Sequence, residues 1–228
     1  MATFQRANSA EQREIRRQEI LDTAAAMLDA MPVGALSLNE LSRRVGLAKS
    51  NVLRYYESRE AVLLELLSRA WERWGAELPG LLAAGVDPGA PASERVERFA
   101  AVVAASLADR PVLCDLLSAQ AGVLEHNVSA EVAAHYKRAA VANVVATATA
   151  LRACLPELDD RDRQQLVAAM IMMVGAVWTH TRPSPAMLAA YEADPSLTAY
   201  AMDFTTSLRQ VLTTLAAGTL AVAASSAR

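Results

Sequence analysis

The stretch from Ser37 to Tyr56 constrains the fold of this 228-residue chain more than any other part of the sequence. Ser37 is a good helix N-cap, and Glu40 three residues later completes the capping-box pattern of a helix start. Gly46 ends this first short helix, because glycine suits the left-handed residue just past a helix end. A second short helix is expected from Lys49 to Tyr56. Two short helices around a tight turn predict a helix-turn-helix.

The two helices can share a small core while the second presents its outer face to DNA. The residues spaced to form that core are Leu41, Val45, Leu47 and Val52. On the outer face, Lys49 and Arg54 can reach phosphates or guanine, whereas Ser50 and Asn51 carry short hydrogen-bonding groups. The major groove admits one helix, and its base edges present a distinct donor and acceptor pattern for each base pair. The sequence therefore predicts an interface with double-stranded DNA.

The rest of the chain has the apolar periodicity of helices and no alternation typical of strands. Residues 1–10 are predicted to be a loose arm, and the helix that follows from Glu11 ends before Pro32. The residues expected on its buried face are Ile15, Ile20, Ala24, Leu28 and Met31. Ser58 caps the next helix, which we expect to end at Leu78-Pro79-Gly80.

A loop rich in glycine and proline precedes the second half of the chain, from Gly85 to Ala92. Further helices are expected over 93–109, 111–124, 128–155, 160–181 and 196–217. The sequence thus predicts an all-α fold, with an N-terminal three-helix helix-turn-helix domain and a C-terminal helical bundle. The expected division is an arm and helix-turn-helix domain at 1–58, a connecting helix at 59–78 and a larger helical domain at 79–228.

The charge distribution also indicates a DNA contact, although the formal net charge is −3. The segment 41–56 holds four basic residues and no acidic one, whereas the chain after Arg73 is net acidic. A small basic patch on an acidic body favours a local contact with nucleic acid. The sequence has neither an apolar signal core at its N-terminus nor an apolar run long enough to span a membrane. We therefore expect a cytoplasmic protein.

The cysteines and histidines do not form a pattern typical of a metal site. Cys114 and Cys154 stand alone in apolar helical segments and are expected to be small buried side chains. Among the histidine pairings, only Glu131 with His135 has same-face helical spacing, which indicates a surface pair. No metal and no cofactor are expected. The sequence shows neither a nucleophile with a nearby base nor a glycine-rich phosphate loop, so an enzyme is not expected either.

Residues 12 to 67 resemble the DNA-binding domain of the TetR/AcrR family of bacterial transcriptional regulators. The motifs that carry this resemblance are Ile20-Leu21-Asp22-Thr23-Ala24-Ala25, Ser37-Leu38-Asn39-Glu40-Leu41, Val45-Gly46-Leu47-Ala48-Lys49-Ser50 and Tyr55-Tyr56-Glu57-Ser58-Arg59-Glu60-Ala61. The resemblance implies that DNA is contacted by Asn39, Lys49, Ser50, Asn51, Arg54, Tyr55 and Arg59. The chain departs from the family at Leu53, where members often have a tyrosine. A tyrosine hydroxyl can bond a phosphate, and a leucine cannot. Either one contact to the DNA backbone is missing here, or Leu53 meets a thymine methyl group instead.

The resemblance also implies a homodimer, since members of this family pair their last two long helices into a four-helix bundle. The segment from Gln165 to Trp178 is apolar on nearly every side and must be covered on several sides. The final helix offers on one side Phe204, Leu208, Val211, Leu212 and Leu215. A two-fold dimer would present two recognition helices to a palindromic operator.

In this family a small molecule often binds inside the C-terminal domain and changes the spacing of the DNA-binding domains. The resemblance thus implies a small apolar or aromatic effector within 79–228. The candidate lining residues are Leu117, His126, Tyr136, Met170, Met173, Trp178 and His180. Methionines suit adaptable apolar cavities, and a histidine or tyrosine supplies a polar anchor. The alternative is that most of these residues are plain core or dimer contacts.

We expect a sequence-specific transcriptional regulator, in the form of a homodimeric repressor that an effector releases from its operator. The sequence leaves open whether it represses or activates. The alternative is a helical interaction protein with a DNA-binding-like domain and no small-molecule ligand, which Leu53 favours. An operator-binding assay separates these two functions.

Overall fold

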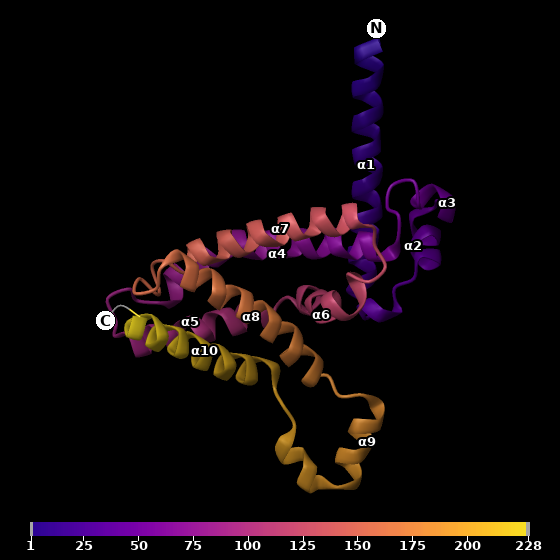
Figure 1. Ribbon diagram of the computed structural model, residues 1–228. Helices are drawn as coiled ribbons and strands as arrows, with labels where there is room; N and C mark the ends of the chain where they lie inside the picture. Colours follow the sequence, from indigo (N-terminus) through magenta and orange to yellow (C-terminus); the bar gives the residue numbers. More distant parts are fainter. Residues whose placement is uncertain (1, 227–228) are drawn as a thin grey trace. The chain divides into compact units, whose positions relative to one another are not determined.

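The computed structural model describes residues 2–226, with side chains from residue 11 onward. Every regular element in this range is a helix, which confirms the predicted all-α fold (Figure 1). The elements are α1 Ala2–Leu28, η1 Val33–Ala35, α2 Leu38–Val45, α3 Lys49–Val52, α4 Arg59–Gly85, α5 Ala92–Ala108, α6 Pro111–Ala119, η2 Gln120–Leu124, α7 Ala130–Ala150, α8 Asp160–His180, α9 Pro185–Ala193, η3 Pro195–Tyr200 and α10 Phe204–Ser226. They form two compact units, which are unit 1 (Met1–Arg69 with Ala119–Arg138) and unit 2 (Ala70–Ser118 with Ala139–Arg228).

Unit 1 is built around the apolar face of α1. The buried residues of that face are Ile20, Leu21, Ala24, Met27 and Leu28. Helix α1 packs against α2, and α2 packs against α3, as expected of a helix-turn-helix domain. Ile15 was predicted on the buried face but is 54% exposed. The reason is that the surrounding helices cover α1 only from Ile20 onward, and residues 11–19 are exposed or half-buried.

Helix α1 begins at Ala2 and not at Glu11, where the sequence predicted its start. Residues 2–10 contain no proline and no glycine. No residue in this segment therefore interrupts the helical hydrogen bonding. The polar composition that suggested a loose arm is compatible with a helix.

Helix α4 continues through its predicted end at Leu78-Pro79-Gly80 and ends at Gly85. A proline inside a helix removes one backbone hydrogen bond and costs about 3 kcal/mol. The apolar face nevertheless continues past it, since Leu78, Leu82 and Val86 are all buried. Burial of each large aliphatic side chain contributes about 1.5–3 kcal/mol, which offsets the cost of the proline.

In unit 2, α10 packs against α5 and α8, and two tryptophans of α4 lie in the core. Trp74 Nε1 donates a hydrogen bond to Ser106 Oγ at 3.0 Å. Trp71 Nε1 donates to Thr147 Oγ1 at 3.3 Å. Both buried indole donors are therefore satisfied, and their rings are fixed to α5 and α7.

Helices α6 and α8 approach each other closely in unit 2. A Cβ atom added at Gly175 of α8 would lie only 2.9 Å from the carbonyl oxygen of Leu117 in α6. Trp178 Nε1 of α8 also donates to Asp115 Oδ1 of α6 at 3.3 Å. A residue without a side chain at position 175 is therefore required for this contact.

The segment between α8 and α10 contains two elements that the sequence analysis did not predict, α9 and η3. A side chain caps the start of each of the three successive elements α9, η3 and α10. Ser184 Oγ accepts a hydrogen bond from the backbone N–H of Met187 at the start of α9. Asp194 Oδ1 accepts from Ser196 N at the start of η3, and Asp203 Oδ1 accepts from Thr206 N at the start of α10. Helix α10 consequently begins at Phe204, later than the predicted residue 196, and reaches Ser226. No residue of α9 or η3 is buried, so the apolar periodicity used for prediction is missing there. Figure 1 shows this segment as an excursion between α8 and α10.

The two cysteines are free and buried, as the sequence predicted. Burial raises the pKa of the Cys114 thiol to about 12, so the group stays protonated and unreactive at neutral pH. Within residues 2–226, no helix combines the length and the apolar character needed to cross a membrane.

Candidate nucleic-acid interface

Local sequence signals fix both ends of α2. Ser37 Oγ accepts a hydrogen bond from the backbone N–H of Glu40 at 3.2 Å, which confirms the predicted N-cap. Gly46 has a φ of 73°, the left-handed conformation expected just past a helix end. Ser58 Oγ likewise accepts from Ala61 N at 3.1 Å and caps α4. The start and end of α2 and the start of α4 are therefore set by their own caps.

Helix α3 spans only Lys49–Val52, and the predicted extension to Tyr56 is a series of turns. The backbone N–H of Arg54 donates to Asn51 O at 3.2 Å, and that of Tyr55 donates to Val52 O at 2.9 Å. These i to i−3 hydrogen bonds tighten the chain and replace the α-helical pattern.

Most of the predicted DNA-contacting residues lie on the surface of unit 1. The exposed ones are Asn39, Lys49, Ser50, Asn51 and Arg54, while Tyr55 is half-buried. Val52 is fully buried, so α3 has an apolar inner side and a polar outer side. Leu53 is 41% exposed beside them. Its side chain has no donor for a phosphate and is available to an apolar group such as a thymine methyl.

Arg59 differs from the other predicted contacts, because its guanidinium has partners inside unit 1. Nη1 donates to the carbonyl oxygen of Leu36 at 3.0 Å. Nη2 lies 2.9 Å from Glu60 Oε1 in an ion pair. Arg59 therefore ties the start of α4 to the chain just before α2, and this side chain braces the helix pair.

Two of the four basic residues in the predicted patch are paired with Glu40. Its Oε1 lies 2.7 Å from Arg43 Nη2 and 2.8 Å from Arg44 Nε. Hydrogen bonds from Arg43 and Arg44 lower the pKa of Glu40 from its usual value near 4.5 to about 2. The carboxylate lies just outside the acid-free segment 41–56, so counting charges within that segment overstated the patch. Lys49 and Arg54 form no ion pair with any described carboxylate, so these two residues carry the remaining positive charge of the basic patch.

Two arginines of α1 hold the backbone that follows α3. Arg13 Nη2 donates to Arg54 O at 3.4 Å, and Arg17 Nη1 donates to Tyr55 O at 3.1 Å. The Arg17 guanidinium also lies 4.5 Å from the centroid of the Tyr56 ring, in a cation–π contact. The backbone partners of these arginines are distant in the sequence, so no role could be predicted for either side chain.

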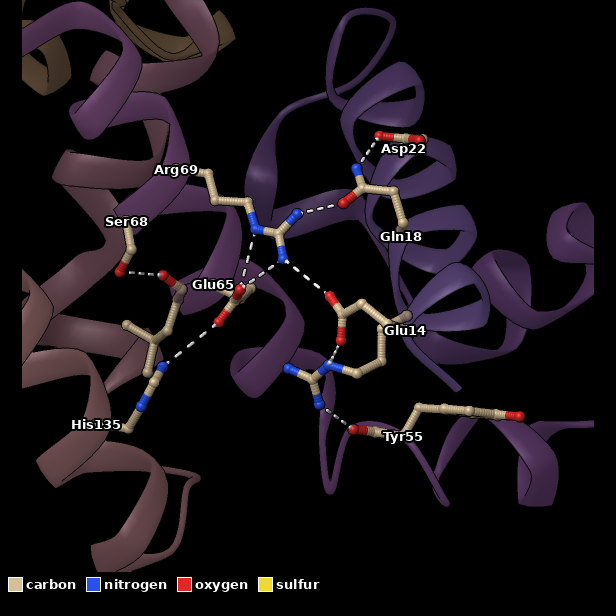
Figure 2. A network of polar contacts seen from close by, with 10 residues as sticks. Glu14, Gln18, Asp22, Tyr55, Glu65, Ser68, Arg69 and His135 are labelled. Carbon is tan, nitrogen blue, oxygen red and sulfur yellow. Dashed lines mark hydrogen bonds and ion pairs between the residues drawn. The ribbon is translucent and has the colours of Figure 1, made fainter. Parts of the chain in front are cut away.

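A polar network joins α1, α4 and α7 within unit 1 (Figure 2). Arg69 Nη2 of α4 lies 3.0 Å from Glu65 Oε1 and 3.8 Å from Glu14 Oε1 of α1. His135 Nε2 of α7 lies 3.8 Å from Glu65 Oε2. The surface partner of His135 is thus Glu65, where the sequence predicted Glu131. These contacts hold α1, and with it the end of α3, against α4.

The predicted effector-lining residues belong to different units. His126 and Tyr136 lie in unit 1, and the other five, Leu117, Met170, Met173, Trp178 and His180, lie in unit 2. The buried ones are Leu117, Tyr136, Met170 and Trp178; Met173 is half-buried, and His126 and His180 are exposed.

Two of the buried side chains, Trp178 and Tyr136, differ in their contacts: the indole N–H of Trp178 has a hydrogen-bond acceptor in Asp115, and the hydroxyl of Tyr136 has no partner among the described residues. Trp178 packs edge-on against Phe204 at 5.0 Å between ring centroids, and Arg182 lies 3.9 Å above its ring. Trp178 is therefore a core contact within unit 2. The Tyr136 hydroxyl, in contrast, is buried and has no hydrogen-bond partner among the described residues. Burial raises the pKa of Tyr136, so its hydroxyl remains a neutral donor.

Both parts of the chain match descriptions of one protein family. Residues 20–66 match "Bacterial regulatory proteins, tetR family", and residues 68–223 match "Tetracyclin repressor-like, C-terminal domain". Two uncharacterized HTH-type transcriptional regulators from strains of Mycobacterium tuberculosis are 29% identical over 80 residues, or 35% of this chain. The match spans 40% of the length of each of these relatives.

Solved structures show the same fold at low sequence identity. A TetR transcriptional regulator from Rhodococcus sp. RHA1 has a TM-score of 0.52 at 16% identity, over 89% of this chain and 95% of that one. A transcriptional regulator from Pseudomonas aeruginosa PAO1 has a TM-score of 0.50 at 16% identity, over 91% of both chains. Since the two family matches together cover residues 20–66 and 68–223, this chain belongs to the TetR family of bacterial transcriptional regulators.

Proposed function

We propose that this chain is a homodimeric repressor that binds a palindromic operator and leaves it when a small molecule binds. The observation that carries the proposal is the outer side of α3, where Lys49, Ser50 and Asn51 are exposed over the buried Val52. In this proposal residues 1–58 contact DNA, 59–78 connect, and 79–228 dimerise and hold the effector.

The chemistry of the α3 surface fits the major groove. Asn51 can accept from and donate to one adenine edge, and Lys49 or Arg54 can donate to guanine or to a phosphate. Asn39 at the start of α2 and Tyr55 after α3 would contact the phosphate backbone of the DNA on either side of the major groove. Phosphate contacts fix the register of the protein on DNA, whereas contacts to base edges select the sequence.

Fluorescence anisotropy against duplexes from the chain's own upstream region tests this proposal. We expect tight, salt-sensitive binding to one palindromic duplex and weaker binding to a scrambled duplex. Asn51→Ala should weaken operator binding by about 1–3 kcal/mol, or roughly 5- to 150-fold, and leave binding to scrambled DNA unchanged. The matched control is Asn127→Ala, at an exposed asparagine between η2 and α7, which should bind as the wild type does.

Equal affinity of the wild-type protein for all upstream and scrambled duplexes would contradict sequence-specific regulation of the neighbouring genes. A scan of further genomic fragments then tests operators elsewhere. If none binds preferentially, the helical interaction protein without a DNA or small-molecule ligand becomes the better description.

The homodimer is supported by exposed apolar and small residues on α8 and α10. On α8 they are Ala168, Met172 and Ala176, and on α10 they are Gly218 and Val222. The side of α10 that the sequence predicted for the dimer is largely used within the chain, because Phe204, Leu208 and Leu212 are buried in unit 2. The proposed dimer face of α10, with Gly218 and Val222, lies next to this buried side of the helix. Val211 and Leu215 are half-buried at the border between the two.

Effector release is supported by the Tyr136 hydroxyl, a buried donor that a ligand acceptor would satisfy. Effector binding would favour a dimer whose recognition helices no longer match successive major grooves. Calorimetric titration of an effector identified by screening tests this mechanism. Weaker effector binding to the operator complex than to free protein is expected, and equal affinity for both would contradict it.

A further inference from the structure

A groove beside the recognition turn is lined by α1 as well as by the end of α3. Its α1 residues are Gln12, Arg13, Ile15, Arg16 and Glu19, and its other residues are Arg54 and Tyr55. We call this the α1 groove. It lies entirely within unit 1, and no residue of α1 was among the predicted DNA contacts.

The shape of the α1 groove is fixed by hydrogen bonds between its two walls. Arg13 and Arg17 donate to the carbonyl oxygens of Arg54 and Tyr55 at 3.4 Å and 3.1 Å. Arg17 is itself held by Glu14, whose Oε2 lies 3.7 Å from its Nε. The groove therefore keeps a set position relative to the end of α3.

The lining of the α1 groove is positively charged and rich in hydrogen-bond donors. It has three guanidinium groups, from Arg13, Arg16 and Arg54, and one carboxylate, from Glu19. That carboxylate pairs with Arg16, at 2.5 Å between Arg16 Nη1 and Glu19 Oε2. Arg13 and Arg54 form no ion pair with any carboxylate in the described part of the chain.

The α1 groove also has an apolar surface, from Ile15, whose side chain is 54% exposed. A DNA strand offers a matching pair of surfaces, since its phosphates are anionic and its deoxyribose rings are apolar. Guanidinium groups bind phosphate oxygens in a bidentate manner, and the amide of Gln12 and the hydroxyl of Tyr55 are further donors.

We propose that the α1 groove holds the sugar–phosphate backbone of the operator next to the major groove occupied by α3. Arg13 contacts one phosphate, Arg16 exchanges its solvent-exposed partner Glu19 for a second phosphate, and Ile15 lies against a deoxyribose. The inference rests on the proposed function and deepens it, because α1 becomes a second DNA-contacting element. These contacts carry no sequence information and supply affinity and register.

The test is the salt dependence of DNA binding by the double variant Arg13→Ala/Arg16→Ala, measured by anisotropy on the operator and on a scrambled duplex. Two lost phosphate contacts should reduce the slope of log K against log salt concentration by about 2. Affinity for both duplexes should fall by a similar factor, so that the preference for the operator is unchanged. The charge-matched control Arg98→Ala/Arg161→Ala removes two exposed arginines of unit 2 and should leave the slope unchanged.

A second double variant, Arg13→Lys/Arg16→Lys, separates phosphate binding from a bracing role. Lysine keeps the positive charge and should retain most of the salt slope. If the lysine variant instead loses the operator preference together with the alanine variant, the arginines position α3 and the inference is overturned. Circular dichroism of each variant establishes that the fold is intact.

The outcomes also separate this inference from the proposed function. If the alanine variant has an unchanged salt slope while the wild type binds the operator normally, the inferred DNA contact at the α1 groove is overturned and the proposed function is not. A wild type that prefers no duplex contradicts the proposed function, while a slope reduced on scrambled DNA would still support a backbone contact at the α1 groove.

Discussion

Glu40 determines how much positive charge α2 presents to solvent. It binds both Arg43 and Arg44, and the ionised form of its carboxylate is stabilised by their hydrogen bonds. Arg59 is held in a similar way by Leu36 and Glu60. Lys49 and Arg54 on the α3 side and Arg13 on α1 form no ion pair with a described carboxylate, and in the proposed interface their charges are available to DNA.

We expect Glu40→Gln to lower the thermal stability at neutral pH and to lose this effect in acid. The pKa of Glu40 in the folded protein is about 2, below its usual value near 4.5. A lowered pKa stabilises the folded state fully above pH 4.5, and the contribution disappears as the pH falls towards 2. Thermal melts followed by circular dichroism from pH 7 to pH 2 should show the two melting curves converging over that window.

The control for this variant is Glu72→Gln, at an exposed glutamate of α4 outside the ion pairs described above. It should shift the melting temperature little at any pH. A constant difference between wild type and Glu40→Gln down to pH 2 would show that the ion pairs with Arg43 and Arg44 are not its cause.

At the scale of elements, the turn between α2 and α3 depends on Gly46. A residue with a Cβ atom in the left-handed conformation costs about 1–2 kcal/mol. No atom lies within 4 Å of a Cβ added there, so the expected loss for Gly46→Ala comes from the backbone alone. Urea unfolding should show a free energy of unfolding lower by that amount.

Gly34→Ala is the matched control for the turn, because Gly34 also has open space around it and no positive φ. Alanine there reduces the conformational freedom of the unfolded chain and should be neutral or stabilising by up to about 1 kcal/mol. Equal destabilisation by the two variants would contradict the role assigned to the left-handed conformation.

The elements that the sequence predicted well are those whose ends carry local signals. The caps at Ser37 and Ser58 and the glycine at Gly46 placed both ends of α2 and the start of α4, whereas α3, which has no side-chain cap, ends at Val52 and not at Tyr56. Prediction failed where burial by distant residues decided the outcome, as in the continuation of α4 past Pro79. It also failed at α9, which has capping residues but no buried side to give a periodic pattern.

The candidate DNA interface was predictable to a similar degree. The outer side of α3 follows from helical spacing, so the exposure of Lys49, Ser50 and Asn51 could be predicted. The partners of Arg59 and Arg13 could not, because Leu36 and Arg54 are brought to them only by the folded chain. A charge count along the sequence does not distinguish a free arginine from one that braces the backbone.

At the scale of the whole molecule, the proposed dimer would raise the affinity for DNA, because two linked recognition elements bind a palindrome far more tightly than one. The proposed contact between copies uses the exposed side of α8 and α10. Small residues such as Ala168, Ala176 and Gly218 would allow helices to approach closely there. Met172 stands among them with 64% of its side chain exposed in the single chain.

We expect Met172→Asp to dissociate the dimer and to weaken operator binding while each chain remains folded. An unpaired carboxylate buried between subunits costs several kcal/mol, and about 3 kcal/mol corresponds to more than a hundredfold weaker association. Sedimentation equilibrium at micromolar concentration measures this loss. The control Leu81→Asp makes the same kind of change at a 38% exposed residue of α4 and should remain dimeric. A Met172→Asp protein that stays dimeric would place the contact between copies on another surface of the chain.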